Sequence, residues 1–287
     1  MLTWGHDLTV LSRNNNIPAN ATAIVAERSA GISQLKHKKF DVTIDFICAN
    51  SFGVNEIFSS FEPGHYILIS TVWLSKREGS PDNWPYISGL TKNYLAGKSD
   101  AENALNKQRS LGKSVTSLRL PVQSGCNDHT QRLMFYFNRM SDGQGLIRVN
   151  GGNNIIQITN SESVVRALTK AVNSELLVDI KLCDAMPGSE KLKDVLQIMS
   201  EGFEVNWFDI SAEKLNILLP EYLKEEPFWG EYKLPENENN LFKITEMKPM
   251  QFGEWILPVK KIFQPNKMSS LRKKEIALIG GAESLIR

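Results

Sequence analysis

The residues with the clearest capacity for chemistry are a tyrosine and a lysine four positions apart, Tyr94 and Lys98. In a helix, residues at this spacing share one face, so the phenol and the ammonium would lie close together. An ammonium beside a phenol lowers the pKa of the phenol, which lets tyrosine exchange a proton with a substrate hydroxyl or carbonyl near neutral pH. A hydroxyl from Thr71 could hold the same substrate oxygen. By itself, however, the pair is weak evidence, because this spacing occurs by chance and more often marks a solvated helix face.

A sheet and a helix must position these residues, and the distribution of apolar residues predicts both. Four short runs rich in β-branched and apolar residues indicate strands, and they show little alternation, which suits strands covered on both faces. Apolar residues at helical spacing follow between Tyr94 and Gln108, and the next run, Val115 to Val122, indicates another strand. The order strand, helix, strand predicts an α/β domain. The four runs cover residues 7–13, 21–26, 41–48 and 65–73.

The later part of the chain continues this pattern less regularly. From Glu204 onward Trp, Pro, Glu and Asn are frequent, and residues 235–240 have turn chemistry, so we expect a substrate lobe with an irregular end. Before that point we expect helices over residues 130–140, 161–172 and 188–199, and strands over residues 146–149 and 176–182.

Composition excludes several classes of function. The 33 Lys and Arg residues nearly balance the 32 Asp and Glu residues, so no global field favours nucleic acid or an anionic membrane. Cys48, Cys126 and Cys183 form no CxxC pair and have no histidine at ligand spacing, which argues against a metal site and for a reducing compartment. Apolar runs are too short to span a bilayer, and no secretory leader follows Met1. We therefore expect a cytoplasmic protein.

Several sequence blocks carry a resemblance to a known family. They are GHDLTVLSRN, FDVTIDFICAN, HYILIST, YLAGKSDAENAL and VTSLRLP followed by DHTQRL, in this order along the chain. Together they resemble the extended short-chain dehydrogenase/reductases, and in particular atypical NAD-dependent epimerases and dehydratases, from about Gly5 to about Phe228. The resemblance implies a Rossmann-like, doubly wound parallel sheet with a smaller C-terminal substrate lobe. It divides the chain into a cofactor-binding domain, residues 1–125, and a lobe, residues 126–272, interleaved with late Rossmann elements.

The resemblance also assigns roles to the residues that could do chemistry. Tyr94 looks like the general acid and base, Lys98 like the residue that tunes it and holds the nicotinamide ribose, and Thr71 takes a place usually held by Ser or Thr. Arg13 stands where the family selects its cofactor. A guanidinium there can pair with the 2′-phosphate of NADP, so NADP is preferred over NAD, although a surface arginine closing a strand is as good an interpretation.

Further positions are assigned to the cofactor and the substrate in the same way. Glu27 replaces an aspartate that family members often direct at the adenine amine. Arg132 is a candidate for holding an anionic or polar substrate, with a solvated helix charge as the alternative. The remaining cofactor positions implied by the resemblance are Phe46, Ile47 and Cys48 beside the adenine and ribose, Ser70 at the end of its strand, and Pro121 beside the nicotinamide carboxamide.

The beginning of the chain departs from the family. A fold of this kind opens with a buried strand, a GxxGxxG turn and a helix whose amino end receives the pyrophosphate. Here residues 1–6 correspond to the end of that helix. Residues 273–287, which include the apolar run Ile276 to Ile279 followed by two glycines, could replace the first strand through circular permutation or exchange between subunits. The alternative is an ordinary C-terminal helix or tail.

Two classes of function follow. The first is an NAD(P)-dependent oxidoreductase, epimerase or dehydratase that acts on a hydroxyl or keto carbon of a nucleotide sugar or small metabolite. The second is a degenerate relative that serves as a binding or scaffold subunit, or a truncated gene product. Retention of Tyr94, Lys98 and Thr71 favours the enzyme, whereas loss of the glycine-rich turn favours the degenerate protein. Many relatives pair through the helix that carries the tyrosine, so a homodimer is also possible.

Overall fold

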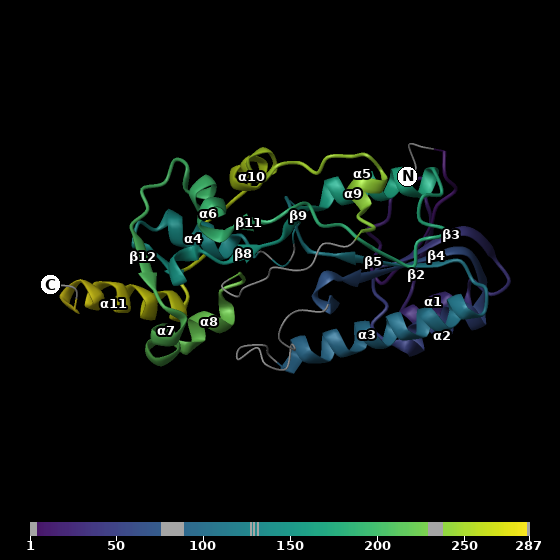
Figure 1. Cartoon of the computed structure of the whole chain (residues 1–287), viewed down its shortest axis with the longest axis horizontal. Helices are drawn as coiled ribbons and strands as arrows, with labels where there is room; N and C mark the ends of the chain where they lie inside the picture. The colour runs from purple at the N-terminus through teal and green to yellow at the C-terminus, as the bar shows by residue number, and fades with distance from the viewer. Residues whose placement is uncertain are drawn as a thin grey trace.

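The chain folds as an elongated α/β molecule with its main sheet at one end and a lobe at the other (Figure 1). The computed structural model describes residues 5–75, 89–126, 128, 130, 132–228 and 238–285. The main sheet has four parallel strands in the order β10-β5-β4-β3, so the chain crosses over between successive neighbours. These strands are β3 (Lys39–Asp45), β4 (Glu62–Thr71), β5 (Val115–Leu120) and β10 (Leu182–Asp184).

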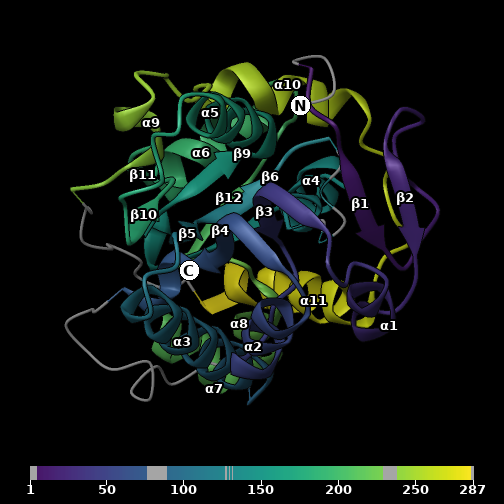
Figure 2. The ribbon, with the colours of Figure 1, turned by 90° about the vertical axis from the view of Figure 1, so that its right-hand side faces the viewer.

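Helices cover both faces of this sheet (Figure 2). Strand β4 shows the cause, because its successive side chains point to opposite faces and the four from Tyr66 to Ile69 are all apolar and buried. Tyr66 and Leu68 pack in one core with α2 (Ser51–Ser60) and α3 (Gly89–Ser110). Ile67 and Ile69 pack in another core with α5 (Ser161–Asn173) and α9 (Leu241–Ile244). The sheet is therefore doubly wound.

A separate parallel pair lies beside the sheet. Strands β1 (Thr9–Ser12) and β2 (Thr22–Val25) pair with each other and are followed by helix α1 (Arg28–Ser33). Ile24 and Ile32 join the core that contains Tyr66. Arg28 also pairs with Asp45 at the end of β3, with a shortest N–O distance of 2.6 Å. Shared apolar burial and the ion pair between Arg28 and Asp45 thus attach strands β1 and β2 to the main sheet.

The lobe is built from short strands and helices around its own apolar core. Helix α4 (Met134–Ser141) contributes Tyr136 and Phe137 to that core, and α10 (Phe252–Lys261) contributes Trp255. Three two-stranded sheets cross it: β6 (Val122–Ser124) with β9 (Ile158–Asn160), β7 (Leu146–Val149) with β12 (Trp207–Ile210), and β8 (Ile155–Ile156) with β11 (Glu190–Lys191). The remaining elements are η2 (Val72–Leu74), η4 (Asn150–Gly152), α6 (Leu192–Ser200), α7 (Ala212–Leu218), α8 (Pro220–Glu225) and α11 (Ser270–Leu285).

The C-terminal segment is a helix, so the hypothesis that it replaces a strand is wrong over the described residues 273–285. In α11, Leu271, Glu275 and Ile279 follow one another at four-residue steps and are all buried against the lobe. The expectation of an irregular end is also wrong, because β12 and α7 to α11 fill most of it. The strand expected over residues 176–182 is wrong except at Leu182, because residues 176–181 form turns and irregular backbone and β10 begins only at Leu182. The two helices expected over 130–140 and 188–199 begin later, at Met134 and Leu192.

Within the residues that the structure describes, no helix combines the length and the apolar character needed to cross a bilayer.

Candidate active site

The candidate active site lies at the carboxyl ends of the central strands. Thr71 is the last residue of β4, and helix α3 brings Tyr94 to the same place. Ligands of open α/β sheets bind outside the carboxyl ends of the strands. The structure therefore brings the predicted tyrosine and threonine together where such a fold binds its ligand.

Tyr94 is half exposed, with 49% of its surface accessible, and its phenol lies close enough to the hydroxyl of Thr71 for the two to interact. Partial burial raises the pKa of Tyr94, while the Thr71 hydroxyl and the charge of Arg132 oppose that rise. The net direction is opposite to the lowering expected from Lys98. Its Nζ lies 5.9 Å from the centroid of the Tyr94 ring and is engaged elsewhere.

Lys98 is buried, with 5% of its surface exposed, and its ammonium binds backbone. Nζ donates to the carbonyl oxygens of Cys48 and Ile69, both at 2.8 Å. Burial lowers the pKa of Lys98, and the charges of Asp45 and Glu102 are among those that oppose this shift. Since an ammonium has three donors, one remains for a ligand. Lys98 thus ties α3 to β4 and to the segment that follows β3.

Gly97, directly before Lys98, allows this close approach. A Cβ atom built on Gly97 would lie 2.2 Å from the carbonyl oxygen of Ala49, which is backbone and cannot move aside easily. Sequence analysis did not single out this residue, although a glycine inside a helical pattern is a recognisable signal of close packing.

Glu102 and Arg119 are two further residues that sequence analysis missed. Glu102 accepts from Nε and Nη2 of Arg119 at 2.9 and 2.6 Å, and from the hydroxyl of Ser70 at 2.6 Å. Ser70 is buried, so its side chain serves this network, and contact with a cofactor as predicted would require that bond to break. The available signal was the position of Glu102, which continues the four-residue spacing of Tyr94 and Lys98.

The segment after β3 presents apolar side chains beside these residues. Phe46 and Ile47 are each 63% exposed, so they can contact a ligand as predicted. The thiol of Cys48 is buried and directed at the carbonyl oxygen of Asn50, 3.4 Å away, and burial raises its pKa. Cys48 therefore acts through its backbone carbonyl, and its side chain does not line the site.

Asp45 shapes this segment and was also missed. Its carboxylate accepts from the backbone N–H groups of Ile47 and Cys48 at 3.2 and 3.0 Å and from the Tyr66 hydroxyl at 2.8 Å. Although burial opposes it, pairing with Arg28 holds the pKa of Asp45 below its usual value. The turn after β3 is thus fixed by a buried, ionised carboxylate.

The other predicted residues lie around this centre. Arg13 and Glu27 are exposed, just beyond the adjacent ends of β1 and β2. Pro121 is buried directly after β5, and its carbonyl oxygen accepts from Gln123 at 3.0 Å. Arg132 is partly exposed, donates to the Thr130 hydroxyl at 2.7 Å, and is near enough for its charge to act on Tyr94.

In the described part of the chain, no three His, Cys, Asp or Glu side chains are grouped so as to hold a metal ion.

Comparisons with known proteins identify the fold. No protein-family model matches this sequence, and neither does any curated protein. Among solved structures, a UDP-galactose 4-epimerase superposes with a TM-score of 0.62 at 13% identity, over 90% of this chain and 90% of that one. UDP-glucuronic acid 4-epimerase from Bacillus cereus, in complex with UDP-glucuronic acid and NAD, gives 0.59 at 11% identity over 86% and 84%. RMD from Pseudomonas aeruginosa, complexed with NADPH, gives 0.54 at 12% over 85% and 89%.

At these identities the comparisons establish the fold, which is the Rossmann-like fold of epimerase structures. The predicted fold class, an α/β doubly wound parallel sheet with a smaller lobe, is confirmed.

Proposed function

We propose that this chain is an NAD(P)-dependent oxidoreductase, epimerase or dehydratase of the extended short-chain dehydrogenase/reductase type. Its substrate would be a nucleotide sugar or small metabolite, and the reaction would take place at a carbon that carries a hydroxyl or keto group. The observation that carries the proposal is that Tyr94 and Thr71 lie together at the carboxyl end of β4. Lys98, four residues further along α3, binds the backbone of the same strand. Solved structures of the same fold include epimerases, one of them with NAD bound, which supports the same conclusion.

The chain's own residues would handle the proton and the orientation of the substrate. The exposed phenol of Tyr94 would exchange a proton with the substrate oxygen, and Thr71 would hold that oxygen through its hydroxyl. Thr71 also accepts a hydrogen bond from the backbone N–H of Trp73 at 3.3 Å, which orients its side chain. A positive charge from Arg132 would favour a substrate that carries a polar or anionic group. A bound nicotinamide would supply the hydride chemistry.

The residues present fit the nicotinamide side and the adenine side of such a cofactor. The remaining donor of Lys98 would hold the nicotinamide ribose, and Phe46 and Ile47 offer an apolar surface to the adenine side. Arg13 would favour the 2′-phosphate of NADP. For the pyrophosphate the described residues offer no glycine-rich turn, and the printed sequence contains no GxxGxxG. No group in the described part of the chain is therefore assigned to the pyrophosphate.

A second candidate function is a binding or scaffold subunit without catalysis, because the bonds of Lys98 to two backbone carbonyl oxygens give that residue a structural role that needs no cofactor. Where β3 ends, the structure places the ion pair between Arg28 and Asp45, which links α1 to the sheet. A protein of this kind would keep the fold while binding cofactor weakly or not at all.

Calorimetric titration with NADP and NAD separates the two functions. For the enzyme we expect micromolar binding, with Tyr94→Phe binding equally well but losing turnover by about 10²–10⁴-fold on responsive sugars or ketones. Arg13→Ala should weaken NADP binding more than NAD binding. Absence of binding at millimolar cofactor, or unchanged turnover in Tyr94→Phe, would refute the enzyme and leave the scaffold subunit.

A further inference from the structure

Helix α3 is attached to the end of β4 by three side chains at four-residue steps. Lys98 donates to the carbonyl oxygen of Ile69 at 2.8 Å, Glu102 accepts from Ser70 at 2.6 Å, and the Tyr94 phenol lies near enough to the Thr71 hydroxyl to interact with it. Three consecutive strand residues are therefore matched to one stripe of the helix. Of the three side chains, Glu102 and Tyr94 lie farthest apart along the helix, and Glu102 has no role in the chemistry proposed above.

Glu102 joins more elements than its neighbours on the stripe. Arg119, its bidentate partner, lies on β5 directly opposite Ser70 in the register of the two strands. The remaining terminal nitrogen of Arg119 donates to the hydroxyl of Ser75, at 3.3 Å, just beyond η2. One buried carboxylate, 9% exposed as a residue, thus connects α3 with β4 and β5 and, through Arg119, with the turn after β4.

We propose that Glu102, through Arg119 and Ser70, is a positioning residue that sets the placement of α3 on the sheet so that the Tyr94 phenol meets Thr71. Lys98 fixes one polar contact between α3 and β4, beside the apolar packing of Ala101, Ala104 and Leu105. Glu102 is eight residues beyond Tyr94, about 12 Å along the helix axis, so a second anchor there fixes both rotation and tilt. The catalytic meaning of this role rests on the proposed function, whereas its test does not.

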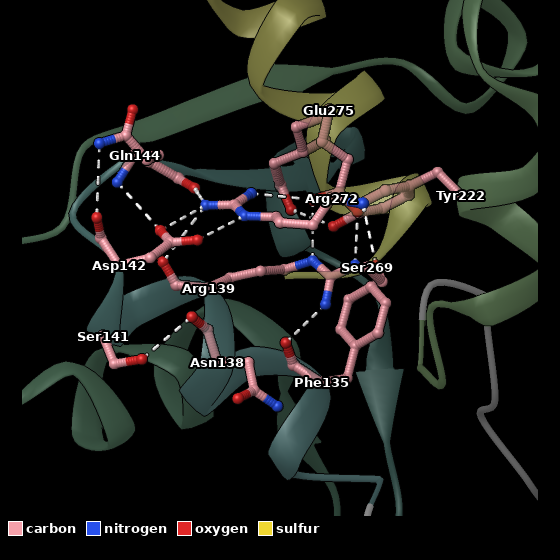
Figure 3. Close-up of polar contacts among 12 residues, drawn as sticks. Phe135, Asn138, Arg139, Ser141, Asp142, Gln144, Tyr222, Ser269, Arg272 and Glu275 are labelled. Carbon is pink, nitrogen blue, oxygen red and sulfur yellow. Dashed lines mark hydrogen bonds and ion pairs between the residues drawn. The ribbon is translucent and has the colours of Figure 1, made fainter. Parts of the chain in front are cut away.

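A purely stabilising role is the alternative, because a buried ion pair is weak evidence of anything more specific. The chain supplies a matched control in the lobe. There Glu275, fully buried, accepts two hydrogen bonds from Arg139 and a third from Arg272 (Figure 3). Both carboxylates form bidentate arginine pairs, but Glu275 contacts none of the three strand residues that meet α3.

The test measures the contact between Tyr94 and Thr71 through its effect on the pKa of the Tyr94 phenol. Carbon-13-labelled tyrosine gives an NMR signal for Tyr94, assigned by its loss in Tyr94→Phe, whose titration reports the pKa of the phenol. In the otherwise unchanged chain Thr71→Val should raise this pKa, because the Thr71 hydroxyl lowers it. In Glu102→Gln we expect that rise to disappear. In Glu275→Gln it should persist in full, even though that variant also loses stability.

Each outcome decides the proposal. If Thr71→Val still raises the Tyr94 pKa in full in the Glu102→Gln background, Glu102 only stabilises the fold and the proposal is overturned. If Glu102→Gln does not fold, Ser70→Ala removes one hydrogen bond and leaves the ion pair. Ser70→Ala should reduce the rise in the Tyr94 pKa that Thr71→Val causes. An undiminished rise would also overturn the proposal. Because no cofactor or turnover enters the measurement, failure of the proposed enzyme activity would leave this result intact.

Discussion

The ammonium of Lys98 lies 2.8 Å from the carbonyl oxygen of Ile69, two residues before the end of β4. With its second bond, to the carbonyl oxygen of Cys48, the same atom spans the carboxyl ends of two neighbouring strands. The residue that family resemblance assigns to the cofactor is therefore also a structural link between helix and sheet. Substitutions at this site affect stability and chemistry together, and each prediction below is paired with a control for that reason.

Replacement of Lys98 by methionine should destabilise the fold. Two buried carbonyl oxygens would lose their donor, and an unsatisfied buried polar group costs about 1–3 kcal/mol. Urea unfolding measures the change, with Lys107→Met as the control. Lys107 is exposed on the same helix, so its replacement should change the free energy of unfolding by less than about 0.5 kcal/mol. Equal stability of the two variants would show that the bonds to Cys48 and Ile69 contribute nothing.

Gly97→Ala should also destabilise the protein, against the preference of helices for alanine. Helix propensity alone would favour alanine by about 1 kcal/mol, but the new Cβ would meet the Ala49 carbonyl oxygen at 2.2 Å. Gly280→Ala in α11 is the matched control, since a Cβ there has nothing within 4 Å and should stabilise by up to about 1 kcal/mol. Thermal unfolding of both variants checks the opposite signs. A more stable Gly97→Ala would show that α3 does not press on this backbone.

Stability should fall as the pH drops through the titration range of histidine, because of His65. This residue is buried, with Nδ1 2.8 Å from the Ser114 hydroxyl and Nε2 3.3 Å from that of Thr116. Burial, together with the charge of Arg109, lowers the pKa of His65 below the ordinary value of 6.5, and a hydrogen bond with the backbone of Ser114 opposes this.

The sign follows from proton binding. Since the folded state has the lower pKa, the unfolded state takes up the proton first, and stability present above pH 6.5 is lost as the pH falls from there through the folded value. Urea midpoints between about pH 8 and pH 5 should show this slope, and His65→Asn should flatten it. His37→Asn, at an exposed histidine, should retain it. An equal slope in His65→Asn would assign the effect to other groups.

Glu275→Gln should weaken the attachment of α11 to the lobe. The change leaves the buried guanidinium groups of Arg139 and Arg272 undercompensated, and breaking a buried pair costs roughly 3–5 kcal/mol. Glu221→Gln is the control, because Glu221 pairs with Lys274 on the surface at 2.9 Å and such pairs contribute about 0–1 kcal/mol. Amide hydrogen exchange in α11, compared between the two variants, measures the local effect. Equal exchange rates would mean that apolar contacts alone hold the helix.

Local periodicity was sufficient for the elements whose residues are close in sequence. The strand at Leu146–Val149 and the helix that carries Tyr94 were predicted because apolar spacing and four-residue neighbours depend on nothing beyond the segment itself. For the same reason Tyr94 and Lys98 share a helix face as expected. The resemblance of the sequence blocks, in their order along the chain, to a known family also predicted the fold class. The solved epimerase structures confirm that fold class.

The tertiary structure decided what depends on partners distant in the chain. Lys98 binds the carbonyl oxygen of Cys48, 50 residues away, and this engagement, together with the burial of Tyr94, reverses the expected direction of the Tyr94 pKa. The apolar run in α11 is compatible with strand or helix. In the fold it is helical, and the buried residues of α11, Leu271, Arg272, Glu275 and Ile279, share one face of a helix but could not share one face of a strand. Periodicity fixes which residues can share a face, whereas burial and opposite charge decide what that face meets.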